Sequence, residues 1–320
     1  MVVSTLEFPA MGSACRILVT GDGGHEHRSL LTGARRRIAD LESRWSRFAP
    51  TSELCTLNAA DGGIRVSAET ATLLALSVEA WSRTAGLFDP TVLTALEAAG
   101  YDRSFELLAA PGLPPRPPGG RPGPTPGCDQ IGIDADGRVA VPHGVRLDLG
   151  GIGKGRAADL VATELLERGA DGVCVDIGGD VRVLGRSPDP AGWAVAINGA
   201  GELDLGVVDL SDGAVATSSI ARRRWTGARG PAHHLVDPRT GEPVVGDLLS
   251  VSVLAAEALW AEVYAKAALV AGAADGVALL VDAGLAAVLV TDGHDVITAG
   301  DIDRFLRDER ARSTAGATGA

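Results

Sequence analysis

The sequence contains few aromatic residues, almost no lysine and no paired cysteines. Aromatic side chains make up 4% of the chain, and only Lys154 and Lys266 among its 29 basic residues are lysine. The four cysteines are scattered, without a C-x-x-C pair. This spacing predicts reduced thiols in a cytosolic protein and argues against a disulfide framework.

Long hydrophobic runs and a basic N-terminal segment are also missing. No stretch reaches the ~18 uncharged apolar residues of a membrane span, and residues 1–9 have neither feature of a signal peptide. We therefore expect a cytoplasmic protein without a membrane anchor. The net charge of −12 disfavours nucleic acid or an anionic membrane as the main partner.

What the sequence does contain is typical of a globular protein. Hydrophobic residues make up 46% and charged residues 22% of its 320 positions, enough for one large or two modest domains. The periodicity and the capping residues predict helices over residues 27–48, from Ser67 to near Gly86, and over 155–168, 256–271 and 274–283, with an irregular stretch up to Asn58. Two short strands are expected within the first 20 residues, on either side of residues 9–13, the second over 14–20. Further strands are expected over 138–141, 144–149, 172–177, 181–184, 193–198, 203–210, 249–255 and 286–291. Because strands and helices do not alternate strictly, an α+β or mixed α/β fold is favoured over a doubly wound sheet.

Two segments are expected to lack regular structure. Residues 111–127 hold eight prolines and five glycines in 17 positions, which predicts an exposed loop. This loop is either a surface insertion or a domain boundary. The small and polar residues 311–320 predict a disordered tail, so residues 1–310 are expected to form the folded part.

A glycine-rich turn lies between Asp148 and Asp159, in the sequence DLGGIGKGRAAD. A strand is expected to end at Asp148 and a helix to begin just after Lys154. Glycines let backbone N–H groups approach phosphate oxygens, while the helix N-terminus and the lysine add positive charge. The turn does not follow the Walker pattern, because Gly155 replaces the Ser or Thr after the lysine. Binding of phosphate and a merely tight turn both remain open.

Two further segments carry polar residues at expected strand ends. Gly178 and Gly179 either bring the backbone close to a ligand or turn a hairpin into residues 181–184; taken alone, the hairpin is favoured. His234 and Asp237 lie just before Pro238, which forces a turn. A histidine at a strand end is suited to acid–base chemistry, but taken alone this pattern favours a structural histidine.

Seven short motifs occur in one order between Met11 and about Gly272. They are M-G-S, S-R-F with S-E-L and L-N, G-L-F-D-P-T, D-L-G-G-I-G-K-G, D-I-G-G-D, A-T-S and H-x-x-D-P-R-T-G. In this order they resemble the ApbE family of FAD:protein FMN transferases. The resemblance implies one T-fold-like domain around a flavin-binding cleft. It also implies cleavage of FAD at its pyrophosphate, transfer of FMN to a threonine of a target flavoprotein, and release of AMP.

The resemblance also assigns residues to the expected site. His234 would be the general base, with Lys154 as a second catalytic group. The positions implied to bind FAD are Met11, Asn58, Asp89, Thr91, Asp148, Gly150, Gly151, Lys154, Asp159, Gly178, Gly179, Ser218, His234 and Asp237.

The implied magnesium site departs from the family pattern. Members use a carbonyl of the glycine turn, here at Gly153, with an aspartate and a threonine of one helix, where this chain has Glu262 and Lys266. Glutamate is a competent Mg²⁺ ligand, whereas a protonated lysine is not. Three possibilities follow: the lysine replaces the metal, the metal binds with fewer ligands, or the protein holds FAD without transferring FMN. Cleavage of FAD by water to FMN and AMP is a further alternative, and Lys266 could also simply extend to solvent.

Overall fold

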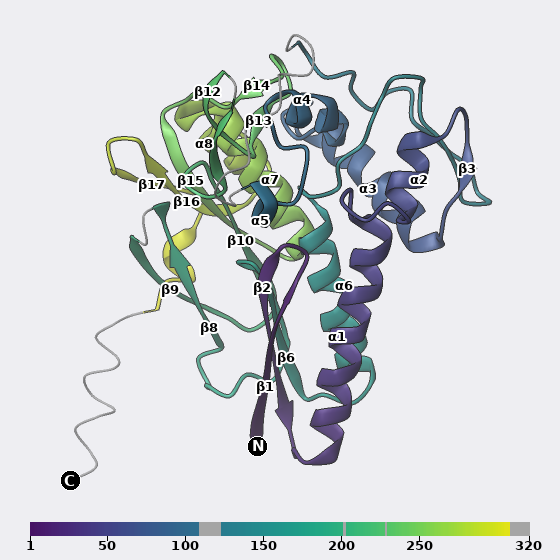
Figure 1. Cartoon of the computed structure of the whole chain (residues 1–320). Helices are drawn as coiled ribbons and strands as arrows, with labels where there is room; N and C mark the ends of the chain where they lie inside the picture. The colour runs from purple at the N-terminus through teal and green to yellow at the C-terminus, as the bar shows by residue number, and fades with distance from the viewer. Residues whose placement is uncertain (109–122, 201–202, 228, 308–320) are drawn as a thin grey trace.

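An eight-stranded antiparallel sheet forms the centre of the computed structural model (Figure 1). The structure describes residues 1–108, 123–200, 203–227 and 229–307. In spatial order the strands are β1 (Val2–Ala10), β2 (Ser13–Gly21), β6 (Gly172–Ile177), β7 (Asp180–Gly185), β10 (Gly213–Ser219), β15 (Leu248–Ala255), β16 (Ala286–Thr291) and β17 (Val296–Ala299). Mixed helices and sheets confirm the α+β class.

Two tight hairpin turns place backbone at the same end of the sheet. Met11 and Gly12 join β1 to β2 with φ of 52° and 63°, and Gly178 and Gly179 join β6 to β7 with φ of 68° and 96°. Two-residue turns with positive φ match the twist of antiparallel strands. The hairpin expected at Gly178 and Gly179 is confirmed.

Helices cover one face of the sheet and a hairpin covers the other (Figure 1). On the first face lie α1 (His25–Trp45), α6 (Gly153–Glu167) and α7 (Ala258–Ala271), with α8 (Ala273–Asp282) beside α7. Helix α7 is buried almost all round, which its alanine-rich sequence allows. On the second face, β8 (Trp193–Asn198) and β9 (Asp204–Leu210) form the hairpin, with the 3₁₀ turn η3 (Ile302–Arg304) close by.

Shorter elements gather around one end of the sheet. They are α2 (Glu53–Ala59), α3 (Ala68–Arg83), η1 (Pro90–Val92), α4 (Leu93–Ala98), α5 (Phe105–Leu108), the small sheet of β3 (Ile64–Arg65), β5 (Arg138–Ala140) and β4 (Gly132–Ile133), and the hairpins β11 (Arg224–Gly227) with β12 (Gly230–His233) and β13 (Val236–Asp237) with β14 (Glu242–Pro243).

Two sequence-based expectations about elements are wrong. The stretch before Asn58 is not wholly irregular, because Ser52 caps α2 by accepting from the backbone N–H of Cys55 at 2.9 Å. No strand forms over residues 144–149. There the backbone of Leu147 bonds to the side chain of Asn58 at 2.8 and 2.9 Å, and the N–H of Asp148 donates to the carbonyl of Pro90.

Some expectations lie partly outside the described residues. Residues 109–122 and 308–320 take in most of the proline-rich loop and the whole expected tail, and the limits of the folded part stay a prediction. Among the described residues, none of the helices combines the length and hydrophobicity that crossing a membrane requires.

Candidate functional site

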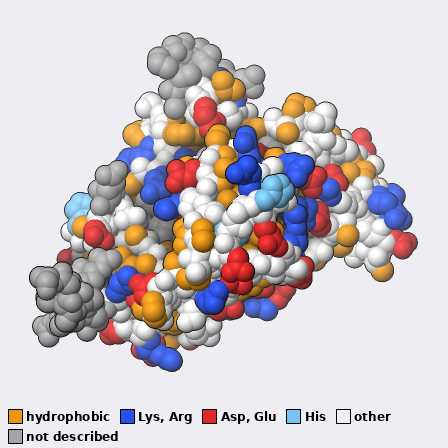
Figure 2. Space-filling view, turned by 90° about the horizontal axis from the view of Figure 1, so that it is seen from below, with side chains coloured by type: hydrophobic (Ala, Val, Ile, Leu, Met, Phe, Trp, Pro, Cys, Tyr) orange, Lys and Arg blue, Asp and Glu red, His pale blue; other side chains and the backbone are white. Residues whose placement is uncertain are grey.

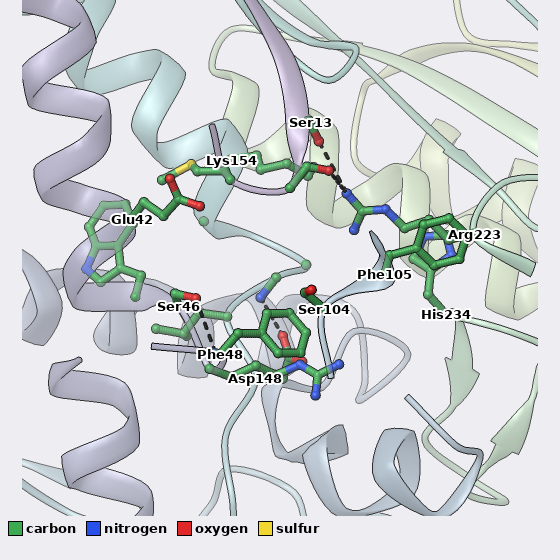
Figure 3. A pocket seen from close by; sticks show the side chains of 18 of the residues that line it. Ser13, Glu42, Ser46, Phe48, Ser104, Phe105, Asp148, Lys154, Arg223 and His234 are labelled. Carbon is green, nitrogen blue, oxygen red and sulfur yellow. Dashed lines mark hydrogen bonds and ion pairs between the residues drawn. The ribbon is translucent and has the colours of Figure 1, made fainter. Parts of the chain in front are cut away.

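A cavity of about 1210 Å³ opens where the first hairpin turn, the glycine turn and the strand end near His234 meet. In Figure 3 the labelled side chains of Lys154, Arg223 and Asp148 surround a common space, with Phe48 and Phe105 beside it. The segments that bring these side chains together are far apart in the sequence. The expected site residues that line the cavity are Met11, Asp89, Asp148, Gly150, Gly151, Gly153, Lys154, His234 and Lys266.

His234 lines this cavity and has one unpaired ring nitrogen. The side chain is half-buried, and its Nδ1, itself a buried atom, has no hydrogen-bond partner among the described residues. Burial lowers the pKa of His234 well below its usual value, and the positive charges of Arg223 and Lys266 lower this pKa further. The imidazole is therefore neutral at pH 7 and free to accept a proton.

The neighbouring His233 has a different environment. Its Nδ1 accepts from the N–H of Leu235 at 3.3 Å, which leaves Nε2 to donate to the carbonyl of Val244 at 3.0 Å. Both ring nitrogens are therefore used to hold the chain between β12 and β14. Of the two adjacent histidines, only His234 lines the cavity.

Arg47 is the arginine of the S-R-F motif, to which the sequence analysis assigned no role, and its side chain is buried at the cavity wall. Its Nε lies 2.7 Å from Asp148 Oδ2, and its Nη1 donates to the carbonyl of Tyr101 at 2.8 Å. The guanidinium also lies between the rings of Phe48 and Tyr101, at 4.2 and 4.4 Å from their centroids. Nη2 is buried and has no hydrogen-bond partner among the described residues.

A cluster of four charged side chains lies at the start of α6. Lys154 Nζ contacts the carboxylate of Asp180 and lies 2.8 Å from Glu262 Oε1. Lys266 Nζ lies 3.5 Å from the same Glu262 oxygen, and the N–H of Gly155 donates to Glu262 Oε2 at 2.9 Å. Three donors thus converge on one carboxylate.

Burial and charge shift the pKa values within this cluster. Burial raises the pKa of Asp180 to about 6, although Lys154 opposes this effect. Burial would also raise the pKa of Glu262, but Lys154 and Lys266 outweigh it and hold that pKa below its usual value. The pKa of Lys154 is raised, because Asp180 and Glu262 outweigh the effect of its burial. Burial lowers the pKa of Lys266, and Lys154 adds to this effect.

A turn with strained backbone, at Arg223, contributes to the cavity wall. Arg223 has a φ of 48°, and its Nη2 donates to the carbonyl of Gly12 at 2.8 Å and to Ser13 Oγ at 3.2 Å (Figure 3). Met11, beside Gly12, also has a positive φ of 52°. Non-glycine residues in this conformation are uncommon and concentrate at functional sites.

Other expected site residues hold the segments that line the cavity. The side chain of Asn58 forms hydrogen bonds with both the N–H and the carbonyl of Leu147, next to Asp148. Asp89, itself at the cavity, accepts from the N–H and hydroxyl of Thr91 at 2.8 and 2.7 Å and from the hydroxyl of Thr125 at 2.5 Å. Neither Asn58 nor Thr91 lines the cavity.

Asp159 also lies behind the cavity, at the junction of two helices. Its carboxylate accepts from the N–H groups of Ala258 and Leu259 at 2.8 and 2.9 Å, so it caps the N-terminus of α7. Burial raises the pKa of Asp159 to about 6. In this structure its direct partners are the first N–H groups of α7 and the guanidinium of Arg182, whose Nε lies 3.3 Å away.

Four more expected residues lie off the cavity lining. Gly178 and Gly179 form the β6–β7 turn, and a Cβ on Gly178 would meet Ser13 Oγ at 2.5 Å. Ser218 is buried in β10, and Asp237 pairs with Arg239 at 2.8 Å. Gly178 and Gly179 shape a turn, whereas Ser218 lies within a strand and Asp237 at the end of β13, and none of the four lines the cavity.

Comparison with protein-family models matches residues 11–290 to the ApbE family. The chain belongs to the ApbE family. It is 32% identical to the FAD:protein FMN transferase of Rhodobacter capsulatus, over 90% of this chain and 55% of that protein. It is 26% identical to the FAD:protein FMN transferase of Vibrio cholerae, over 86% of this chain and 83% of that protein. The chain thus spans about 55% of the length of the first of these relatives.

Solved structures show the same fold. The ApbE protein of Thermotoga maritima superposes with a TM-score of 0.84 at 26% identity, covering 96% of this chain and 100% of that one. The flavin transferase ApbE of Vibrio cholerae gives 0.79 at 24% identity, covering 95% and 99%. The expected ApbE-like α+β fold is confirmed.

The metal ligands implied by the ApbE resemblance do not fit Mg²⁺ in this chain. Both oxygens of Glu262 already accept from Lys154 and from the N–H of Gly155, and an ammonium replaces the third ligand at Lys266. A protonated lysine has no lone pair to donate and repels a cation. Gly153 does line the cavity, but the set Gly153, Glu262 and Lys266 offers no free carboxylate oxygen beside it.

Proposed function

We propose that this chain is an FAD:protein FMN transferase that attaches FMN to a threonine of a target flavoprotein and releases AMP. The observation that carries the proposal is the position of His234. It is a neutral, half-buried imidazole with an unpaired nitrogen, in a cavity that it shares with the glycine turn and both lysines. Family membership supports the same reaction.

The reaction requires alignment, neutralisation of phosphate charge and removal of one proton. The threonine oxygen attacks the phosphorus on the FMN side, so a new P–O bond forms and the P–O bond to AMP breaks. AMP leaves with the electron pair of that bond. His234 takes the hydroxyl proton as general base, a contribution of about 10²–10⁴-fold to the rate.

The remaining cavity residues have matching roles in this proposal. Gly150 and Gly151 allow close backbone approach to the pyrophosphate. Lys266 and Arg47 supply positive charge at the cavity wall, and the rings of Phe48, Tyr101 and Phe88 offer an apolar surface for the dinucleotide. No step in this scheme passes through Mg²⁺, because the residues at the implied metal site do not fit it.

The reaction implies FAD as a small-molecule substrate and a flavoprotein as the protein partner. The acceptor must bring its threonine to the cavity mouth, close to Arg223. A cytoplasmic location and the absence of nucleic-acid binding stay predictions from the sequence. On the face shown in Figure 2, acidic, basic and hydrophobic side chains are interspersed, and no broad field of one charge stands out.

The test is a transfer assay on the purified full chain. The protein is mixed with FAD and with a panel of flavoproteins that carry FMN on threonine, after removal of their flavin. We expect flavin fluorescence that stays on an acceptor after denaturation, together with an equal amount of AMP. AMP and FMN without a labelled acceptor would indicate hydrolysis instead. FAD bound without AMP release would indicate a binding protein.

A further inference from the structure

We propose that the ammonium of Lys266 serves as the resident cation for the FAD pyrophosphate, so that the chain binds FAD without a divalent metal ion. This inference rests on the function proposed above. It assigns to a side chain the charge neutralisation that other family members are expected to obtain from Mg²⁺.

The first observation is the way the Glu262 carboxylate is used. Its Oε1 accepts from Lys154 at 2.8 Å and its Oε2 accepts from the N–H of Gly155 at 2.9 Å. Lys266 Nζ lies 3.5 Å from the same Oε1. A divalent cation at this point would have to displace Lys154 and also tolerate an adjacent ammonium, which costs both hydrogen bonds and Coulomb energy.

The second observation is the position of the Lys266 side chain. Lys266 lines the cavity together with Gly151 and His234, and it is mostly buried. Its stem passes directly over the glycine turn, because a Cβ on Gly151 would lie 3.1 Å from Lys266 Cε and 3.1 Å from the ring of Phe88. The absence of a Cβ at Gly151 therefore makes room for this lysine as well as for a ligand.

The third observation is the charge balance at the cavity floor. Lys154 is paired with both Asp180 and Glu262, so it is occupied by protein carboxylates. In the described part of the chain, Lys266 has one long ion pair, at 3.5 Å. An ammonium has three N–H donors, so at least two of them are available to phosphate oxygens. Lys266, rather than Lys154, is the lysine free to meet the ligand.

Binding of FAD provides a direct test that does not depend on turnover. The full chain is titrated with FAD by calorimetry in EDTA and again in excess Mg²⁺. We expect the two affinities to agree within about twofold. Lys266→Gln should weaken binding by about tenfold or more, the typical value of a hydrogen bond to a charged group. Lys266→Arg should retain most of the affinity, because it keeps the charge.

Controls separate the lost contact from lost folding or lost net charge. Arg36→Gln removes one positive charge from an exposed position on α1 outside the cavity, and its FAD affinity should match that of the unaltered chain. Circular dichroism and thermal melting verify that each variant is folded. If Lys266→Gln does not fold, Lys266→Met and Lys266→Arg provide the same comparison.

A metal-binding measurement gives an independent readout. Mn²⁺ alone, followed by its electron paramagnetic resonance signal, should show no saturable binding to the unaltered chain. The double variant with Glu262→Asp and Lys266→Thr should gain Mn²⁺ binding and a Mg²⁺-dependent FAD affinity. Saturable Mn²⁺ binding by the unaltered chain would overturn the inference, as would FAD binding that requires Mg²⁺ and is unchanged in Lys266→Gln.

The outcome separates this inference from the proposed function. Tight FAD binding in EDTA that depends on Lys266 but leads to no FMN transfer would contradict the function and leave the cation assignment standing. Transfer that is abolished by EDTA and restored by Mg²⁺ would contradict the assignment and leave the function standing.

Discussion

At the scale of single residues, the adjacent histidines show how local bonding decides function. His233 uses both ring nitrogens in hydrogen bonds to the backbone, whereas the Nδ1 of His234 is unpaired. The place of His234 before the Pro238 turn made it a candidate from the sequence, and the motif resemblance assigned it the role of general base. The structure adds the burial that lowers the pKa of His234.

We predict that His234→Ala reduces FMN transfer by about 10²-fold or more while leaving FAD affinity nearly unchanged, because it removes a proton acceptor. The lowered pKa keeps the imidazole neutral as the pH falls, so the acid limb of the rate profile should lie below pH 6.5, the ordinary value. Transfer rates from pH 5 to 8 measure both effects. Equal losses in binding and rate would make His234 a binding residue, and an acid limb above pH 6.5 would contradict a lowered pKa.

Arg47 carries a second residue-scale prediction. It forms a buried ion pair with Asp148, whose side chain is 9% exposed. Arg47→Met leaves that carboxylate buried and unpaired, so we expect a loss of about 3–5 kcal/mol in the free energy of unfolding. Adding Asp148→Asn should recover part of the loss, as urea denaturation of both single variants and the double variant would measure. Strictly additive losses would show that the two side chains are not coupled.

At the scale of elements, helices α6 and α7 meet beside the cavity and contribute Gly153, Lys154 and Lys266 to its lining. Asp159 of α6 caps the start of α7, and Glu262 of α7 accepts from the N–H of Gly155 near the start of α6. Each helix thus supplies a carboxylate to backbone N–H groups at the start of the other, and Lys154 and Lys266 both lie close to Oε1 of Glu262. These long-range pairs could not be inferred from the separate helix sequences.

Gly155 makes this junction possible. A Cβ there would lie 2.4 Å from the carbonyl oxygen of Ala258. We expect Gly155→Ala to lower the free energy of unfolding by about 1–3 kcal/mol, because overpacking of backbone outweighs the better helix propensity of alanine.

Gly246→Ala provides the matched control for this substitution. Gly246 is exposed, and no atom lies within 4 Å of a Cβ added there. Its unfolding curve in urea should therefore nearly overlay that of the unaltered chain. A Gly155→Ala variant as stable as Gly246→Ala would contradict close packing of α6 against α7.

Most long elements could be predicted from the sequence, since their periodicity and caps are local signals. The strand over Trp193–Asn198 and the cap at Ser67 are confirmed. Strand β10 was missed, because Gly213–Ser219 is a run of small residues without the usual β-branched pattern. The strand expected over residues 144–149 fails, because the side chain of Asn58 takes the place of a neighbouring strand.

At the scale of the whole molecule, the fold brings segments from residues 7 to 270 around one cavity. The motifs predicted the glycine turn, both lysines and His234 as site residues, because glycine turns and charged residues form recognisable sequence patterns. They included Arg47 in S-R-F without assigning it a role, and they did not indicate the pairing of Lys154 with Asp180 and Glu262. Such contacts depend on tertiary packing, which a single sequence does not display.

A crystal structure of the full chain with FAD, grown in EDTA, tests the central claim most directly. We predict that the pyrophosphate lies above Gly150 and Gly151, within hydrogen-bond distance of Lys266, with the phosphorus on the FMN side facing His234. FAD bound elsewhere on the molecule, or with its pyrophosphate turned away from both side chains, would contradict the account.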